Sequence, residues 1–152
     1  MTIALALLAG VLAGLRAMTP LAAASWAARL GLVNLEGTWL AFLGYSWTPV
    51  ILTVLALVEL VTDQLPSTPS RTVPQQFGAR LVTGALAGMV FASSMSMAAG
   101  ATAGVVGAII GTLGGARARA RLAASFGRDL PAALVEDAVA ILGALLVVLA
   151  LR

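Results

Sequence analysis

The sequence contains no cysteine, no histidine and no lysine, and only 10% of its 152 residues are charged. Without cysteine and histidine the chain lacks a disulfide framework, the usual zinc and haem ligands, a thiol nucleophile and an imidazole base. Soluble domains of this size carry about 25% charged residues. These absences argue against a soluble enzyme, and we expect neither a cofactor nor a metal ion.

Apolar residues are abundant instead. They make up 61% of the chain, and the mean hydropathy is +1.03. Several apolar runs approach the length of about 20 residues that a helix needs to cross a bilayer. The sequence therefore predicts a single all-α integral membrane domain over residues 1–152. The net charge of +3 comes from arginines gathered mainly in two loops, so we expect the lipid bilayer as partner and no nucleic acid.

The apolar runs predict about five transmembrane helices, the first of which is broken or re-entrant. The first run is interrupted by Arg16–Pro20. Thr48 and Asp129 are predicted N-caps, and Pro49 suits the first turn of a helix. The predicted spans cover residues 2–32, 48–65, 80–98, 100–115 and 131–151.

Arginines predict the orientation of these spans. The loops 66–80 and 116–130 carry six of the nine arginines and lie on one side if the third and fourth spans form a hairpin. The positive-inside rule places that side in the cytoplasm. Segment 33–47, rich in Trp and Tyr, and the C-terminus then face outside. The N-terminus is inside if 2–31 is one broken helix, and outside if this segment is a hairpin.

A weak internal repeat joins the two halves of the chain. Residues 9–20 align with 83–94, with three small residues in register. Halves 1–65 and 78–152, each with three elements, would have opposite orientations, as in the inverted repeats of small transporters. The alternative is that helices rich in Gly and Ala resemble one another by composition.

The interruption in the first run predicts a site for an anion. Thr19 followed by Pro20 predicts a new helix beginning at Pro20, with free N–H groups inside an apolar stretch. A helix N-terminus and the permanent charge of Arg16 both favour phosphate or carboxylate groups. The repeat aligns Ser93 and Ser94, placed in the middle of the third span, with Thr19 and Pro20. The alternative is that Arg16 pairs with an acidic side chain or reaches the membrane surface.

Glu59 and Asp63 are the predicted partners of this site. They lie four residues apart and share one helix face, and Glu59 is flanked by apolar residues. We interpret them as coupling or gating charges, with a purely structural ion pair as the alternative. Glu136 and Asp137 are predicted to complement the dipole of the last helix and to pair with arginines of 117–128.

Glycines of the fourth span form one smooth face. Their spacing of three and four residues lets helix backbones approach closely. We expect tight packing within the chain or across a homo-oligomer, with a dimer favoured. The face comprises Gly100, Gly104, Gly107, Gly111 and Gly115.

Three segments, GLRAMTP (14–20), ELVTDQLP (59–66) and ARLVTGALAG (79–88), resemble a family of small bacterial membrane proteins known as domain of unknown function 4126 (DUF4126). The resemblance implies an integral protein of the bacterial inner membrane. It supplies no substrate and no reaction.

The resulting hypothesis is a transport protein, either a channel or a carrier, with a midplane site for an anionic solute or a lipid phosphate headgroup. A second hypothesis is a structural subunit that docks onto a larger complex through its glycine faces. A membrane enzyme comes last, because it needs a nucleophile or a metal cluster and no serine has a recognisable base beside it.

Overall fold

The computed structural model describes residues 2–65 and 70–152, and these residues form seven helices. Six are α-helices and η1 is a 3-10 helix. The elements are α1 (Thr2–Leu15), α2 (Met18–Arg29), η1 (Trp39–Gly44), α3 (Thr48–Thr62), α4 (Pro74–Phe91), α5 (Met97–Phe126) and α6 (Asp129–Leu149). The all-α prediction is confirmed.

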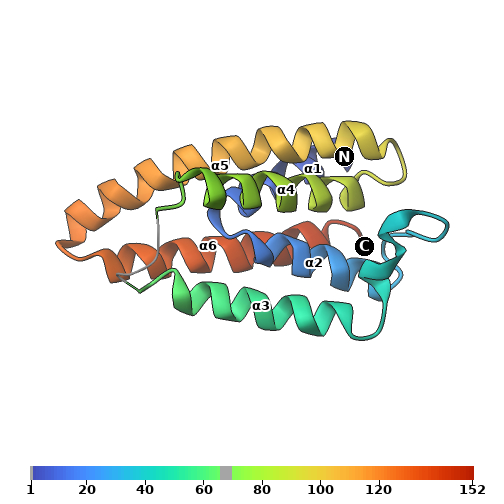
Figure 1. The fold of residues 1–152 in the computed structure, drawn as a ribbon, viewed down its shortest axis with the longest axis horizontal. Coiled ribbons are helices and arrows are strands. Elements are labelled where there is room, and N and C mark those ends of the chain that lie inside the picture. Colours follow the sequence, from blue (N-terminus) through green and yellow to red (C-terminus); the bar gives the residue numbers. More distant parts are fainter. Residues whose placement is uncertain (1, 66–69) are drawn as a thin grey trace.

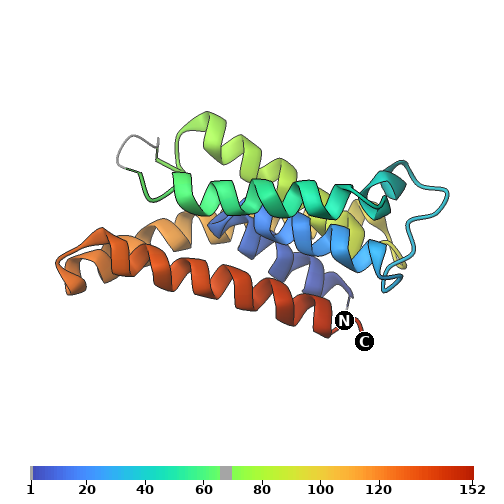
Figure 2. The same ribbon diagram turned by 90° about the horizontal axis from the view of Figure 1, so that it is seen from below.

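The α-helices lie roughly along one axis and alternate in direction from each to the next (Figures 1 and 2). Both chain termini therefore lie at the same end of the bundle (Figure 2). The first apolar region is a hairpin of two short helices, α1 and α2, which reverses at Arg16 and Ala17. Of the two readings of residues 2–31, the hairpin is the one that the structure shows.

Two helices, α5 and α6, are long and apolar enough to cross a membrane, and α1 and α3 are shorter apolar helices. Much of the outer surface of α3 and α6 is also apolar. Its exposed large side chains include Ile51, Val54, Leu57, Val58, Val61, Leu134, Val139, Leu142, Leu145 and Leu146.

The glycine face of α5 packs against α1 and α4. All five predicted glycines are buried. A methyl group at Gly104 would overlap the carbonyl oxygen of Gly84 in α4, and one at Gly111 would overlap the carbonyl oxygen of Val11 in α1. The backbones therefore touch directly, as small-residue faces allow. The predicted close packing is confirmed, and it lies within the chain.

Helix α4 is displaced from its predicted position. It begins at Pro74, inside the predicted loop 66–79, because proline suits the first turn of a helix. It ends at Phe91. Ser93 and Ser94 are therefore wrong as mid-helix residues: they lie in the turn between α4 and α5. Residues 66–69 of that loop lie outside the described residues.

Helix α5 is longer than predicted. The basic segment expected to be a loop over 116–130 is helical as far as Phe126. Ala and Arg, which dominate its first half, are both good helix formers. The helix ends at Gly127, whose φ of +66° is the left-handed conformation typical of a glycine C-cap. The two predicted cytoplasmic segments still lie at one end of the bundle, because α4 and α5 form the expected hairpin (Figure 1).

The predicted caps are shifted by one or two residues. Helix α2 begins at Met18, so Thr19 lies inside the helix and does not cap it. Thr48 and Asp129 are the first residues of α3 and α6, and the N-caps are Trp47 and Arg128. Helix assignments commonly differ by this amount.

The predicted aromatic segment contains η1. Trp39, Tyr45 and Trp47 are exposed there. Helix α2 holds this segment in place, because the Ser25 hydroxyl donates a hydrogen bond of 2.5 Å to the carbonyl oxygen of Leu43.

Candidate functional site

Arg16 stands at the reversal between α1 and α2, with no exposed surface. Its Nη1 group pairs with Asp63, which follows α3. Its Nε and Nη2 groups lie 2.6 Å and 2.5 Å from Oδ1 of Asp137 in α6. One buried guanidinium therefore joins the hairpin turn to two helices that are distant in the sequence.

Glu59 caps the N-terminus of α2. Its two carboxylate oxygens accept hydrogen bonds of 2.7 Å and 2.8 Å from the backbone N–H groups of Ala17 and Met18. Free N–H groups and the helix dipole make such an N-terminus attractive to an anion. In this structure the anion is a carboxylate of the chain itself.

Arg80 caps the other side of the same turn. Its side chain is 2% exposed, and its Nη1 group donates hydrogen bonds of 3.1 Å and 2.6 Å to the carbonyl oxygens of Gly14 and Leu15. Its Nη2 group lies 3.3 Å from Asp63 and 3.9 Å from Glu59. A cation at the end of α1 and an anion at the start of α2 both match the helix dipoles.

A second set of ion pairs lies further along α5 and α6. Arg71 binds Glu136 through both oxygens of the carboxylate. Arg119 lies 3.5 Å from Glu136 and donates hydrogen bonds of 3.0 Å and 2.5 Å to Asp129. Gln64 donates a hydrogen bond of 3.1 Å to Asp137. Five of the six acidic residues of the chain and four of its nine arginines thus form two adjacent sets of ion pairs, together called the ion-pair network.

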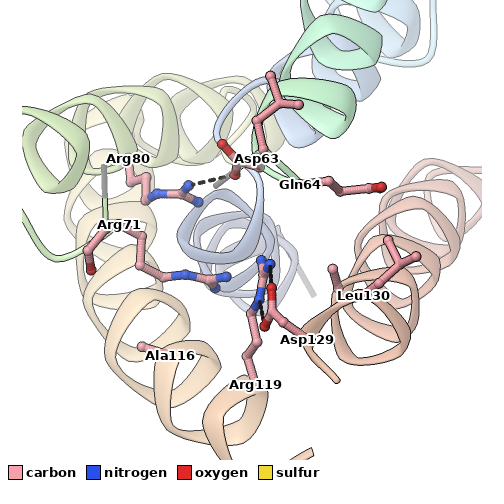
Figure 3. A pocket seen from close by; sticks show the side chains of 11 residues that line it. Asp63, Gln64, Arg71, Arg80, Ala116, Arg119, Asp129 and Leu130 are labelled. Carbon is pink, nitrogen blue, oxygen red and sulfur yellow. Dashed lines mark hydrogen bonds and ion pairs between the residues drawn. The ribbon is translucent and has the colours of Figure 1, made fainter. Parts of the chain in front are cut away.

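An open cavity of about 540 Å³ lies beside this network. Figure 3 shows the side chains of three arginines at this cavity. Arg71 comes from the segment before α4, Arg80 from α4 and Arg119 from α5. The charged residues that line it are Asp63, Arg71, Arg80, Arg119 and Asp129.

The predicted site residues are only partly brought together. Arg16, Glu59 and Asp63 meet at the hairpin turn, and Thr19 and Pro20 are buried in the first turn of α2. Among the described atoms, the Thr19 hydroxyl has no hydrogen-bond partner. Ser93 and Ser94 are not part of the site. The turn lies level with the end of α3 and the start of α4, and not halfway along these helices (Figure 1).

Sequence reasoning missed Asp137 and Arg80 as members of the site. Glu136 pairs with Arg119 as expected, but Asp137 faces Arg16. A signal was present, because Asp137 lies eight residues into an apolar helix, beyond the first turn where a dipole role applies. Arg80 was placed at the boundary between the loop 66–80 and the third span, whereas α4 begins at Pro74 and buries it.

The arrangement offers charge and little else. Within residues 2–65 and 70–152, no group of three His, Cys, Asp or Glu side chains is placed to hold a metal ion. The guanidinium groups can bind oxyanions, and the carboxylates can exchange partners.

Comparison with known proteins gives a family and no function. No curated protein and no solved structure matches the chain significantly. One family model, described as a domain of unknown function, matches residues 3–150. The match covers nearly the whole sequence, and the chain therefore belongs to the DUF4126 family.

Proposed function

We propose that the chain is a small membrane transport protein, a channel or carrier for an anionic solute or for the phosphate headgroup of a lipid. One observation carries this proposal: Arg16 is fully buried at a helix reversal and is shared between carboxylates of two other segments. Ionisable groups inside an apolar helical bundle are expensive, and they commonly mark a substrate or ion pathway.

The apolar exterior supports a membrane location. Exposed leucine, isoleucine and valine side chains cover α3 and α6, and a bilayer would solvate them. We assign α3–α6 as spans. Helices α1 and α2 have 14 and 12 residues, and α3 has only 15, against about 20 for a full span. We assign α1 and α2 to a re-entrant hairpin because their reversal at Arg16 lies beside Asp137, partway along α6. The inverted repeat stays a prediction, because any up-and-down bundle alternates in direction.

The orientation follows from the arginines. The α5–α6 turn and the segment before α4 lie at the end that carries most of the positive charge, and we place this end in the cytoplasm of a bacterial inner membrane. Both termini and the exposed aromatic side chains around η1 then face outside. Aromatic residues favour the membrane–water interface.

Partner exchange is the proposed mechanism. A buried guanidinium strongly resists losing its only counter-charge, but exchanging one oxyanion for another leaves it paired. A solute anion that replaces Asp63 or Asp137 on Arg16 would release that carboxylate. Because Asp63 follows α3 directly and Glu59 holds the start of α2, the exchange would couple solute binding to the α2–α3 contact.

The test is anion flux through the purified protein in liposomes. Glu59→Gln keeps an acceptor for the N–H groups and removes the charge, so it tests gating in a folded protein; Arg16→Gln tests anion binding. The matched control is Arg29→Gln, an exposed arginine at the end of α2. We expect each site variant to change flux about tenfold, equivalent to about 1.4 kcal/mol, and the control to match wild type. Unchanged flux of every tested anion in the folded site variants would refute the proposal.

The glycine faces do not support the alternative of an assembly subunit. They are buried against α1 and α4 within the chain, so these five glycines are not available to a partner. Contact between copies of the chain would need another surface.

A further inference from the structure

The cavity beside the ion-pair network is lined by cations from three separate segments. Arg80 lies in α4, Arg71 precedes α4, and Arg119 lies in α5. The guanidinium groups of Arg71 and Arg119 extend toward one another, and that of Arg80 is directed at Asp63 (Figure 3). The volume of about 540 Å³ falls within the about 300–1,000 Å³ typical of small-molecule sites.

The donors of Arg80 are already engaged by the chain. Its Nη1 group binds the carbonyl oxygens of Gly14 and Leu15, and its Nη2 group faces Asp63. Its Nε atom is buried without a hydrogen bond among the described residues, and the cavity does not reach it. Arg80 therefore contributes positive charge to the cavity, and direct contacts with a ligand fall to Arg119 and Arg71.

Arg119, another cation of the cavity, is paired with an exposed carboxylate that a ligand can replace. Asp129 binds Arg119 with both oxygens, but its side chain is 62% exposed. Exposed ion pairs contribute about 0–1 kcal/mol. The Arg71–Glu136 pair differs, because both side chains are less than 10% exposed. Asp129 is the carboxylate that an incoming anion can displace.

The surrounding charge favours an anion once Asp129 moves. Asp63, the other acidic residue in the lining, is neutralised by Arg16 and Arg80. Exposed arginines on the neighbouring end of α5 and the α5–α6 turn raise the local positive potential, which attracts anions. These are Arg117, Arg121 and Arg128.

We infer that this cavity is a binding site for a phosphate group, held by Arg119 beside Arg71 with Arg80 adding positive charge, and that Asp129 is a built-in competitor which occupies Arg119 when the site is empty. Arginine forks match phosphate oxygens in pairs. The phosphate group belongs either to a soluble phosphate compound or to a lipid headgroup. The inference does not require transport. The cavity adjoins the Arg16 site, with which it shares Asp63 and Arg80, but Arg16 does not line it.

The decisive variant is Asp129→Asn. It removes the competitor at an exposed position, and a poorly folded protein would not bind more tightly. We expect inorganic phosphate or pyrophosphate, titrated calorimetrically into the full chain in detergent, to bind about fivefold more tightly than to wild type. The matched control is Glu36→Gln, an exposed acid outside the network, which should bind like wild type.

Arg119→Gln should weaken binding about tenfold or more, because a charge-assisted donor pair is lost. Arg119→Lys, which keeps the charge without the forked donor pair, should have an affinity between those of wild type and Arg119→Gln.

A parallel titration with a short-chain phosphatidic acid identifies the source of the phosphate group. Tighter binding of the lipid indicates a headgroup site, and equal or tighter binding of inorganic phosphate or pyrophosphate indicates a soluble ligand. The inference is overturned if none of these probes binds, or if Asp129→Asn and Arg119→Gln both leave affinity unchanged.

Discussion

Arg16 and Asp137 lie 121 positions apart in the sequence, and their side chains meet at 2.6 Å inside the bundle. No local pattern connects them. The contact closes the α1–α2 hairpin against α6, and it gives the buried guanidinium a counter-charge that α3 alone would only partly supply.

The first prediction concerns the strength of this pair. Arg16→Gln leaves Asp137 and Asp63 short of a counter-charge, and we expect it to lower the free energy of unfolding by about 3–5 kcal/mol. Asp137→Asn should be similarly damaging. The double variant should lose less than the sum of the two, which a double-mutant cycle of unfolding in detergent measures. Additive losses would show that the two side chains do not interact.

The second prediction concerns the carboxylate cap on α2. Glu59→Ala removes the acceptor for two backbone N–H groups, so the protein should lose about 1–3 kcal/mol of stability. Glu59→Gln should lose less, because its amide oxygen still accepts. Hydrogen exchange at Ala17 and Met18 should quicken in the alanine variant. If these two amides exchange as slowly as in wild type, the cap is not formed.

The third prediction concerns the glycine face, and the chain offers a matched control on the same helix. Gly104→Ala would place a methyl group against the backbone of Gly84, and we expect a loss of about 1–3 kcal/mol. Gly114 has open space around it, so Gly114→Ala should be neutral or stabilise by up to about 1 kcal/mol. Thermal unfolding of the two variants compares them. Equal effects would contradict direct backbone contact between α4 and α5.

The fourth prediction concerns orientation. Because the chain contains no cysteine, single-cysteine variants carry one label each. Ser70→Cys and Ser125→Cys, both exposed at the arginine-rich end, should resist a membrane-impermeant thiol reagent added to intact cells. Asn34→Cys, exposed at the other end, should react. The reverse pattern would invert the proposed orientation.

Local patterns predicted the helices well and the site less well. The sequence predicted three features closely, because each depends only on neighbouring residues: the apolar runs, the helix start at Thr48–Pro49 and the break near Arg16. The glycine spacing predicted a packing face because a helix brings positions three and four apart onto one side.

The errors arose where tertiary contacts decide the outcome. Charge suggested loops over 66–80 and 116–130, but α4 already begins at Pro74 and α5 continues to Phe126. Carboxylates neutralise Arg80 within the bundle, and the end of α5 is free to face water. Composition aligned Ser93 with Thr19, yet Ser93 lies in the exposed turn between α4 and α5 and Thr19 is buried in the first turn of α2. The partner of Arg16 in α6 depends on how the helices pack, which no spacing reveals.

Helix α3 differs from its neighbours in what holds it. It buries only Pro49 and Ala56, while Glu59 and Asp63 bind the hairpin turn and Arg80. Helices α1, α4 and α5 are held together by direct backbone contact, which no ligand or charge change can readily release. Helix α3 is fastened at this end by charge, and a change of counter-ion or of protonation can undo such a fastening. The bundle thus combines three tightly packed helices, α1, α4 and α5, with one helix, α3, that is held mainly by ion pairs.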